Sequence, residues 1–356
     1  MPRPVEATID LQALRNNLAV AKRHAGSAGV FAVVKANGYG HGLEHIVPGL
    51  ADADGFAVIE LDAALQIRSS GIDKPVLLLE GCFDEADLTH ASSHGLSTVV
   101  HEQGQARLLT GARMPQPIDV FLKVNTGMNR LGFTLGEAGD VHAKLKASAN
   151  VRRIILMTHF ADADGKRGVD WQLSPFEKLA SSLAVETCAA NSAALLRYPQ
   201  TCGAWVRPGI MLYGASPFDD KSADELGLRP VMTLRSQLIG VQRLAAGDSV
   251  GYGCSFTAER PMRIGVVATG YGDGYPRHAP SGTPVMVDGK PCETVGRVSM
   301  DTLCVDLEVA PVAGIGSAVT LWGEGLPVER VAASAGTVSY ELLTKVTARV
   351  PFRIRA

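Results

Sequence analysis

The sequence lacks the features that mark several broad classes of protein. Its net charge is only −2 over 356 residues and no run of five like charges occurs, so its charge does not favour nucleic acid or an acidic membrane surface as a partner. No apolar stretch of membrane-spanning length is free of charged residues, and residues 1–7 contain no apolar signal-peptide core. The six cysteines show no C-x-x-C spacing, which is typical of reduced thiols rather than of a disulfide framework or zinc site. We therefore expect a cytoplasmic protein.

The first two-thirds of the chain contains short apolar segments of strand length. Most of them are separated by stretches with a helical spacing of apolar residues, such as 10–24, 61–70, 102–110 and 175–183. Eight strands with intervening helices in about 225 residues fit a (β/α)8 barrel, and a doubly wound sheet is the alternative. The expected strands lie near 30–34, 55–59, 76–79, 97–100, 119–124, 153–158, 184–189 and 205–213.

The sequence pattern changes near residue 230. Residues 231–238 partly alternate between apolar and polar side chains, and Asp288-Gly289 is a tight-turn signal. We therefore expect an α/β chain with a TIM-type barrel over 1–230 and a C-terminal mainly-β domain over 231–356. Further strands of the second domain are expected near 263–268, 284–287 and 303–307, and a short helical segment near 328–346.

The most informative segment is Val33-Val34-Lys35-Ala36-Asn37-Gly38-Tyr39-Gly40-His41-Gly42. A lysine that ends a buried strand is partly desolvated, and desolvation favours the neutral amine that attacks a carbonyl. Glycines on alternate positions let backbone N–H groups approach an anion closely. Together they suit a cofactor that has an aldehyde and a phosphate.

Three other interpretations of this segment exist. The first is a surface lysine before a flexible turn. The second is a dinucleotide-binding fingerprint, but Leu43 occupies the third glycine position of G-x-G-x-x-G. The third is a zinc site, because residues 41–45 fit H-x-x-E-H; a helix there would open with Gly42 and meet Pro48 soon afterwards.

A barrel places the residues that follow its strands at one rim, where the chemistry of such folds occurs. Several charged and polar side chains stand at these positions. They are Lys35, Glu60, Glu80, His101, Lys123 with Asn125, His159, Asn191 with Ser192, and Arg207.

The chain resembles the bacterial alanine racemases, which are pyridoxal-phosphate enzymes with an N-terminal (β/α)8 barrel and a C-terminal β domain. The resemblance covers essentially the whole chain, and several separate motifs occur in the same order. They are the segment 33–42, Leu122-Lys123-Val124-Asn125-Thr126-Gly127-Met128-Asn129-Arg130-Leu131-Gly132, Asn191-Ser192-Ala193-Ala194, Val206-Arg207-Pro208-Gly209-Ile210-Met211-Leu212-Tyr213-Gly214, Val250-Gly251-Tyr252-Gly253 and Gly296-Arg297-Val298-Ser299-Met300-Asp301.

The resemblance implies how the cofactor, pyridoxal 5'-phosphate, is held. Lys35 matches the lysine that forms a Schiff base with the cofactor aldehyde. Tyr39, Ser192 and the backbone at Gly209 and Ile210 match the phosphate-binding positions. Hydroxyl and backbone N–H groups are suitable donors to a phosphate.

Three cationic residues match further positions of the family. Arg207 matches the arginine that faces the pyridine nitrogen, and because arginine does not give up its proton, the ring nitrogen should stay unprotonated. Arg130 matches the arginine near the phenolic oxygen of the cofactor and the substrate carboxylate. Lys123 matches a lysine that is often carbamylated, which would give Arg130 a negative neighbour; a plain amine with another partner is the alternative.

Racemisation needs a base on each face of the reacting carbon. Lys35 serves one face, and Tyr252 matches the family's second base, which comes from the partner subunit of a homodimer together with Met300. His159 matches the histidine that hydrogen-bonds this tyrosine. Tyr271 and Arg297 match the substrate-entry region.

One position departs from the family pattern. Ala348 stands where some relatives have a tyrosine that touches the phosphate, so this hydroxyl contact is missing. The resemblance implies interconversion of L- and D-alanine, in cell-wall synthesis or in alanine metabolism. The alternatives are an amino-acid decarboxylase of the same fold, a racemase that also accepts serine, a non-catalytic pyridoxal-phosphate carrier, and a zinc hydrolase.

Overall fold

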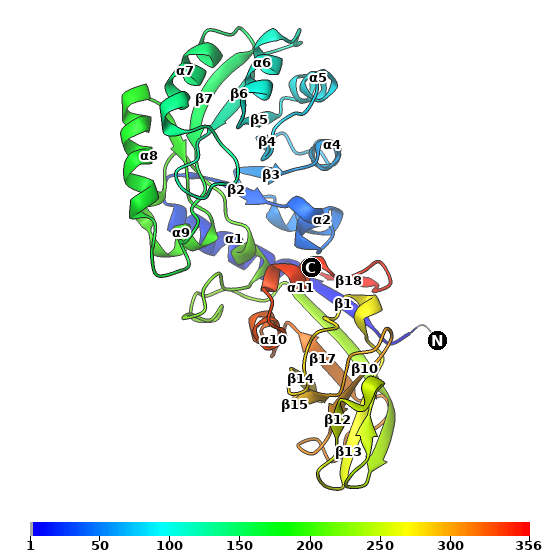
Figure 1. Ribbon diagram of the computed structural model, residues 1–356. Helices are drawn as coiled ribbons and strands as arrows, with labels where there is room; N and C mark the ends of the chain where they lie inside the picture. Colours follow the sequence, from blue (N-terminus) through cyan, green and yellow to red (C-terminus); the bar gives the residue numbers. More distant parts are fainter. Residues whose placement is uncertain (1–2) are drawn as a thin grey trace.

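A closed barrel of eight parallel strands forms the first part of the chain, as expected (Figure 1). The structure, a computed structural model, describes residues 3–356. Phe31 and Phe121 come from opposite sides of the barrel, and their ring centroids lie 5.7 Å apart, so aromatic side chains fill the interior. The barrel strands are β2 (Gly29–Val33), β3 (Gly55–Val58), β4 (Val76–Leu78), β5 (Ser97–Val100), β6 (Ile118–Lys123), β7 (Val151–Met157), β8 (Glu186–Cys188) and β9 (Trp205–Val206).

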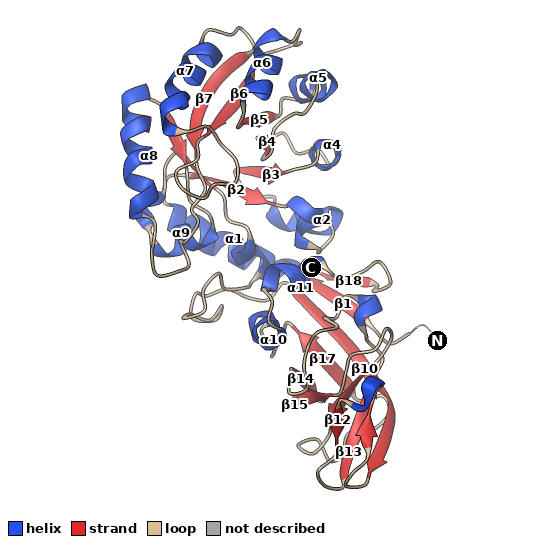
Figure 2. Ribbon diagram, viewed as in Figure 1, coloured by secondary structure: helices blue, strands red, loops and turns tan. Residues whose placement is uncertain are grey.

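Helices surround the barrel strands (Figure 2). Helix α7 begins with a capping box, in which the Thr134 hydroxyl and the Glu137 carboxylate each accept a backbone N–H from the other residue. No helix in residues 3–356 has both the length and the apolar character needed to cross a membrane. The helices of this part are α1 (Leu11–Ala25), α2 (Lys35–Tyr39), α3 (Leu43–Ile46), α4 (Leu61–Ser69), α5 (Glu85–Ser93), α6 (Gln103–Gly111), α7 (Leu135–Lys146), α8 (Asp170–Leu183) and α9 (Ser192–Arg197).

The last barrel strand is much shorter than the expected 205–213. Strand β9 ends at Val206, and residues 210–213 form the short helical turn η3 (Ile210–Tyr213). Pro208 has no N–H to offer a neighbouring strand, which explains why pairing stops there. The expectation of a continuous strand was wrong, and the bend brings Gly209 and Ile210 to the barrel mouth.

The second domain is built on an eight-stranded sheet with the order β13-β16-β15-β14-β17-β10-β1-β18. Its longest strand, β10, pairs with β17 through residues 234–237 and with β13 through residues 238–244. Asp288 and Gly289 both have positive φ and form the expected tight turn between β14 and β15. Besides β1 and β18, the elements are β10 (Met232–Leu244), β11 (Ser249–Val250), η4 (Tyr252–Cys254), β12 (Phe256–Thr257), β13 (Met262–Val267), η5 (Tyr271–Asp273), β14 (Pro284–Val287), β15 (Lys290–Val295), β16 (Leu303–Asp306), β17 (Ala318–Trp322), α10 (Val328–Ala335) and α11 (Ser339–Thr344).

The two ends of the chain meet in this sheet. Strand β1 (Glu6–Asp10) pairs antiparallel with β10 and parallel with β18 (Phe352–Arg355). Residues 6–10 therefore belong to the second sheet, whereas the sequence pattern predicts the barrel domain over 1–230. Both pairing partners of β1 lie more than 200 residues along the chain, so no local pattern could show this pairing.

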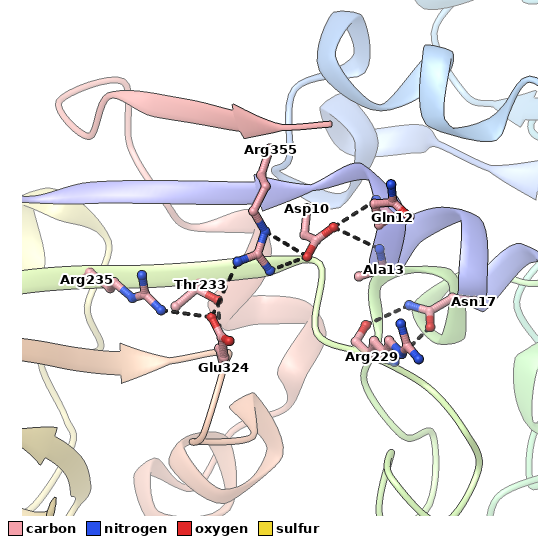
Figure 3. Close-up of polar contacts among 9 residues, drawn as sticks. All are labelled: Asp10, Gln12, Ala13, Asn17, Arg229, Thr233, Arg235, Glu324 and Arg355. Atoms are coloured by element: carbon pink, nitrogen blue, oxygen red, sulfur yellow. Dashed lines mark hydrogen bonds and ion pairs between the residues drawn. The ribbon is translucent and has the colours of Figure 1, made fainter. Parts of the chain in front are cut away.

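Asp10 lies where β1 passes into the first helix (Figure 3). One of its carboxylate oxygens accepts the N–H groups of Gln12 and Ala13, at 2.8 and 2.9 Å, and so caps α1. The other accepts from Arg355 Nε at 3.0 Å. One side chain thus joins the start of α1 to the last strand of the chain.

A second contact between the domains lies beside the lysine motif. The backbone of Gly40 approaches α11 so closely that a Cβ on this residue would lie 2.1 Å from the carbonyl oxygen of Leu343. Only glycine fits here, because Gly40 also has a φ of +78°. The second domain is therefore packed directly against the segment that follows Lys35.

Candidate active site

One cavity of about 870 Å³ lies at the carboxyl ends of the barrel strands. Nine of the residues singled out from the sequence line it, together with Glu80 and Asn191 from the expected rim, whereas Glu60, His101 and Asn125 lie outside its lining. The nine are Lys35, Tyr39, Lys123, Arg130, His159, Ser192, Arg207, Gly209 and Ile210.

Lys35 enters the cavity from a strained segment. The residues of α2 that follow it do not form a right-handed helix, because Ala36, Asn37, Gly38 and Tyr39 all have φ between +51° and +64°. A left-handed conformation costs an L-residue about 1–2 kcal/mol. This left-handed turn (residues 36–40) places both Lys35 and Tyr39 on the cavity wall.

Ser192 and Gly209 lie at the centre of a polar cradle (Tyr39, Ser192, Gly209 and Ile210). The buried Ser192 Oγ accepts the N–H of Gly209 at 2.8 Å, so its own hydrogen is free for another acceptor. A Cβ at Gly209 would lie 2.4 Å from the Tyr39 hydroxyl oxygen, so glycine is required for the tyrosine to reach this place. The cradle offers hydroxyl and backbone donors to an anion.

Arg207 is buried and held by main-chain carbonyls. Its two terminal nitrogens donate to the carbonyl oxygens of Cys188 and Thr158, at 2.7 and 2.8 Å, and to that of Ala189 at 3.2 Å. Carbonyl groups fix the guanidinium without neutralising its charge. Arg207 therefore presents a permanent positive charge to the cavity.

Several cationic groups share this enclosed space. Burial lowers the pKa of Lys35, and the neighbouring Arg130 lowers it further. Burial, assisted by Arg207 and Arg130, lowers the pKa of Lys123 to about 8. The same causes, burial first and then Arg207, hold the pKa of His159 well below its usual value, so its ring is neutral. The cavity suits an anionic ligand, and the Lys123 amine in it is partly uncharged near neutral pH.

Tyr340 is a cavity residue that sequence reasoning missed. It lies on α11 of the second domain, and its ring centroid is 6.0 Å from that of Tyr39. Burial raises the pKa of its hydroxyl to about 12, so it remains a donor. Ala348, which stands where some relatives have a tyrosine, does not line the cavity. No spacing in the sequence relates residue 340 to the barrel motifs.

The two residues that the resemblance assigns to the partner subunit lie away from this cavity. Tyr252 and Met300 are on the second domain, 71 % and 52 % exposed, and neither lines the cavity of its own chain. Tyr252 is in η4, between β11 and β12. Figure 1 shows β12 in the part of the second domain that lies away from the barrel. Arg297 lies next to this turn, since a Cβ at Gly253 would be 3.4 Å from its guanidinium.

A buried carboxylate supports the turn that carries Met300. Asp273 is fully buried and pairs with Arg3 at 2.6 Å and Arg349 at 3.4 Å. It belongs to η5, which also contains the expected entry residue Tyr271, and the Tyr271 N–H donates to the carbonyl of Ser299 at 3.0 Å. The hydrogen bond to Ser299 thus ties η5 to the residue before the exposed Met300.

The chain matches known proteins along its whole length. Residues 9–217 match the family described as alanine racemase, N-terminal domain, and residues 231–354 match alanine racemase, C-terminal domain. An alanine racemase of Thiobacillus denitrificans is 57 % identical over 349 residues, which cover 98 % of this chain and 95 % of that protein. An alanine racemase of Burkholderia mallei is 53 % identical and covers 99 % of both chains.

The fold agrees with the sequence matches. The crystal structure of a biosynthetic alanine racemase from Pseudomonas aeruginosa superimposes with a TM-score of 0.97 at 47 % identity, covering 99 % of this chain and 100 % of that chain. Since sequence and structure agree across both domains, this chain belongs to the alanine racemase family.

Proposed function

We propose that this chain interconverts L-alanine and D-alanine with pyridoxal 5'-phosphate as cofactor, as a homodimer that shares its active sites. The observation that carries the proposal is a single cavity in which Lys35, the polar cradle and Arg207 meet. A lysine, an anion site and a fixed cation are what this cofactor's aldehyde, phosphate and ring nitrogen require. The decarboxylase, carrier and zinc-hydrolase alternatives are not favoured.

The residues of the cavity fit the cofactor. The polar cradle would hold the phosphate, because the Ser192 hydroxyl keeps a free donor and Gly209 leaves room that a Cβ would fill. Tyr340 adds a hydroxyl beside Tyr39 from the second domain. This hydroxyl offers a substitute for the one that Ala348 lacks.

Pyridoxal phosphate, when bound, would supply an electron sink that acidifies the Cα–H of the substrate. Lys35 Nζ moves that proton on one face, which its lowered pKa favours. Arg130 lines the same cavity and would bind the substrate carboxylate through its planar guanidinium.

The second base must come from another copy of the chain. Tyr252 is exposed and absent from the lining of its own cavity, and Met300 is placed likewise. We infer that residues 231–356 of one subunit cover the barrel mouth of the other. The partner's Tyr252 then serves the opposite face of Cα, the partner's Met300 contacts the substrate, and His159 accepts a hydrogen bond from the tyrosine.

Arg207 favours racemisation over other reactions of the same cofactor. Its contacts leave the guanidinium charge unneutralised at a fixed place, and arginine does not transfer its proton to a ring nitrogen. A ring nitrogen that stays unprotonated withdraws electrons less strongly, which limits transamination and decarboxylation.

The test uses the purified holoenzyme. We expect absorbance of a lysine-bound cofactor, formation of D-alanine from L-alanine, and exchange of the substrate Cα hydrogen with solvent deuterium. A chain that binds the cofactor but exchanges no Cα hydrogen in alanine would contradict the proposal. The same assay with serine defines how broad the specificity is. The cytoplasmic location expected from the sequence stays a prediction.

A further inference from the structure

The left-handed turn after Lys35 requires support from outside its own backbone. All five of its residues have positive φ, and three of them carry side chains. Such a turn persists only where surrounding contacts over-determine it. Its main-chain bonds include Gly40 N–H to the carbonyl of Ala36 at 3.0 Å. Its end is held by a side chain, that of His41.

His41 is fully buried directly after the turn. Its Nδ1 lies 3.1 Å from the carbonyl oxygen of Gly38 and 2.9 Å from that of Tyr39. Because carbonyl oxygens only accept, the ring proton must be on Nδ1. The other nitrogen, Nε2, is buried and has no partner among residues 3–356. The ring is therefore neutral, and burial lowers the pKa of His41 to about 4.

The His41 ring also takes part in a set of aromatic contacts that connects to β2, the strand before Lys35. The centroid of the His41 ring lies 4.7 Å from that of Tyr213, and the Tyr39 ring stacks on the same Tyr213 at 4.6 Å. The Tyr213 hydroxyl donates to the carbonyl of Val33 at 2.9 Å, two residues before Lys35. The segment from Val33 to His41 is thus fixed at both ends.

We propose that His41 is a positioning residue that sets the places of Lys35 and Tyr39 through its Nδ1–H hydrogen bonds. The inference rests on the proposed function of those two residues. His41 does not line the cavity, so it acts only through the turn. Without its N–H, the strained turn relaxes, the Tyr39 hydroxyl leaves Gly209, and the Lys35 amine loses its alignment.

Three variants test this role. His41→Leu keeps a branched side chain but removes the donor. His41→Asn restores a donor, since the asparagine amide nitrogen lies at about the place of Nδ1. His45→Leu is the matched control, because His45 lies just beyond the turn in α3, makes no hydrogen bond to the turn, and is likewise outside the cavity lining. Each holoenzyme is examined for kcat and KM with alanine, for dissociation of pyridoxal phosphate, and for thermal unfolding.

We expect His41→Leu to lose about tenfold in kcat per bound cofactor and to release the cofactor about tenfold faster, with KM for alanine little changed. His41→Asn should recover to within about threefold of the wild type, and His45→Leu should match it. A variant His41→Leu that is less thermostable but retains kcat and cofactor dissociation would show a merely structural role. An equal defect in His41→Asn would also overturn the proposal.

A spectroscopic measurement does not depend on activity or on variants. Nitrogen NMR of the histidine rings in the wild-type holoenzyme should show His41 as the Nδ1–H tautomer through neutral and mildly acidic pH. Observation of the Nε2–H tautomer would overturn the inference even if His41→Leu failed to fold. A wild-type chain that binds no pyridoxal phosphate would instead overturn the proposed function.

Discussion

The barrel cavity and the exposed face of the second domain carry two halves of the proposed machinery in opposite physical settings. In the cavity, Arg207 and Ser192 are buried and fixed by main-chain partners. On the second domain, Tyr252 and Met300 face solvent from short turns, and Tyr252 lies between two glycines with positive φ. Tyr252 does not line the cavity of its own chain, so it can act in the proposed reaction only on a substrate bound by another subunit. The proposed dimer would complete this exposed face with a second copy of the chain.

Replacement of Lys35 by alanine removes the base from the buried half and should have the largest effect. We expect at least about a 10⁴-fold loss of racemase activity, because both the covalent attachment and the proton transfer are lost. Borohydride reduction of the wild-type holoenzyme followed by peptide mapping should place the pyridoxyl label on Lys35. Lys144→Ala, on the exposed face of α7, is the control. A label on any other lysine would contradict the assignment.

Complementation between subunits tests whether the two halves belong to different chains. Lys35→Ala and Tyr252→Phe should each be nearly inactive alone. After full subunit exchange, half of the dimers are heterodimers with one intact site of two, so about a quarter of wild-type activity should return. Exchange is verified by mass spectrometry of differently tagged subunits. If heterodimers form and no activity returns, the two bases do not meet across an interface.

Carbamylation of Lys123 involves the barrel cavity alone, and its loss should lower activity less than the two preceding changes. Burial, with Arg207 and Arg130 nearby, lowers the pKa of this amine to about 8, so about a tenth of it is neutral at pH 7. A neutral amine adds carbon dioxide, forming an N–C bond and releasing a proton, and the resulting carbamate is a negative partner for Arg130. We expect removal of carbon dioxide to lower activity about tenfold, with bicarbonate restoring it. Carbon NMR with labelled bicarbonate should show the carbamate. If no carbamate signal appears, Lys123 is a plain amine with Glu80 as its negative neighbour.

Asp10→Asn should have the smallest effect, a small loss in the free energy of unfolding. It changes the contact between α1 and β18 and leaves the cavity and the exposed face of the second domain intact. Asparagine still caps α1, so only the pairing with the exposed Arg355 is lost, which is worth about 0–1 kcal/mol. Burial raises the pKa of Asp10, but hydrogen bonds from Ala13 and Arg355 outweigh it and leave the pKa below its usual value. The stabilisation is therefore present above about pH 4 and disappears as the pH falls through the lowered pKa. Urea unfolding at several pH values measures it, with Asp84→Asn, at the cap of α5, as the control.

The sequence predicted the elements whose signals are local. Short apolar segments located seven of the eight barrel strands and the start of the eighth, and the Asp288-Gly289 dipeptide located its turn. Elements at the chain ends could not be placed, because β1 and β18 are short and their partners lie far along the chain. The strand expected over 205–213 failed for a different reason, since its apolar residues Ile210–Tyr213 pack as a helical turn.

The candidate site shows the same limit. The nine lining residues that the sequence singled out were found because each follows a barrel strand or stands in a motif. Tyr340 was missed because it comes from α11, and only the packing of the second domain against Gly40 brings it to the barrel mouth. The left-handed run of residues 36–40 was also hidden, because asparagine and glycine adopt positive φ as single residues and alanine rarely does so.

The close contact between Gly40 and the Leu343 carbonyl has a mechanical consequence. The contact between the two domains lies in the segment that follows Lys35. There the backbone of Gly40 meets the Leu343 carbonyl with no side chain between them. A rotation of one domain against the other would push first on a strained turn that begins one residue after Lys35. In the proposed dimer, an opening between the two subunits would admit substrate without disturbing this contact, whereas an opening between the two domains of one subunit would disturb the turn after Lys35.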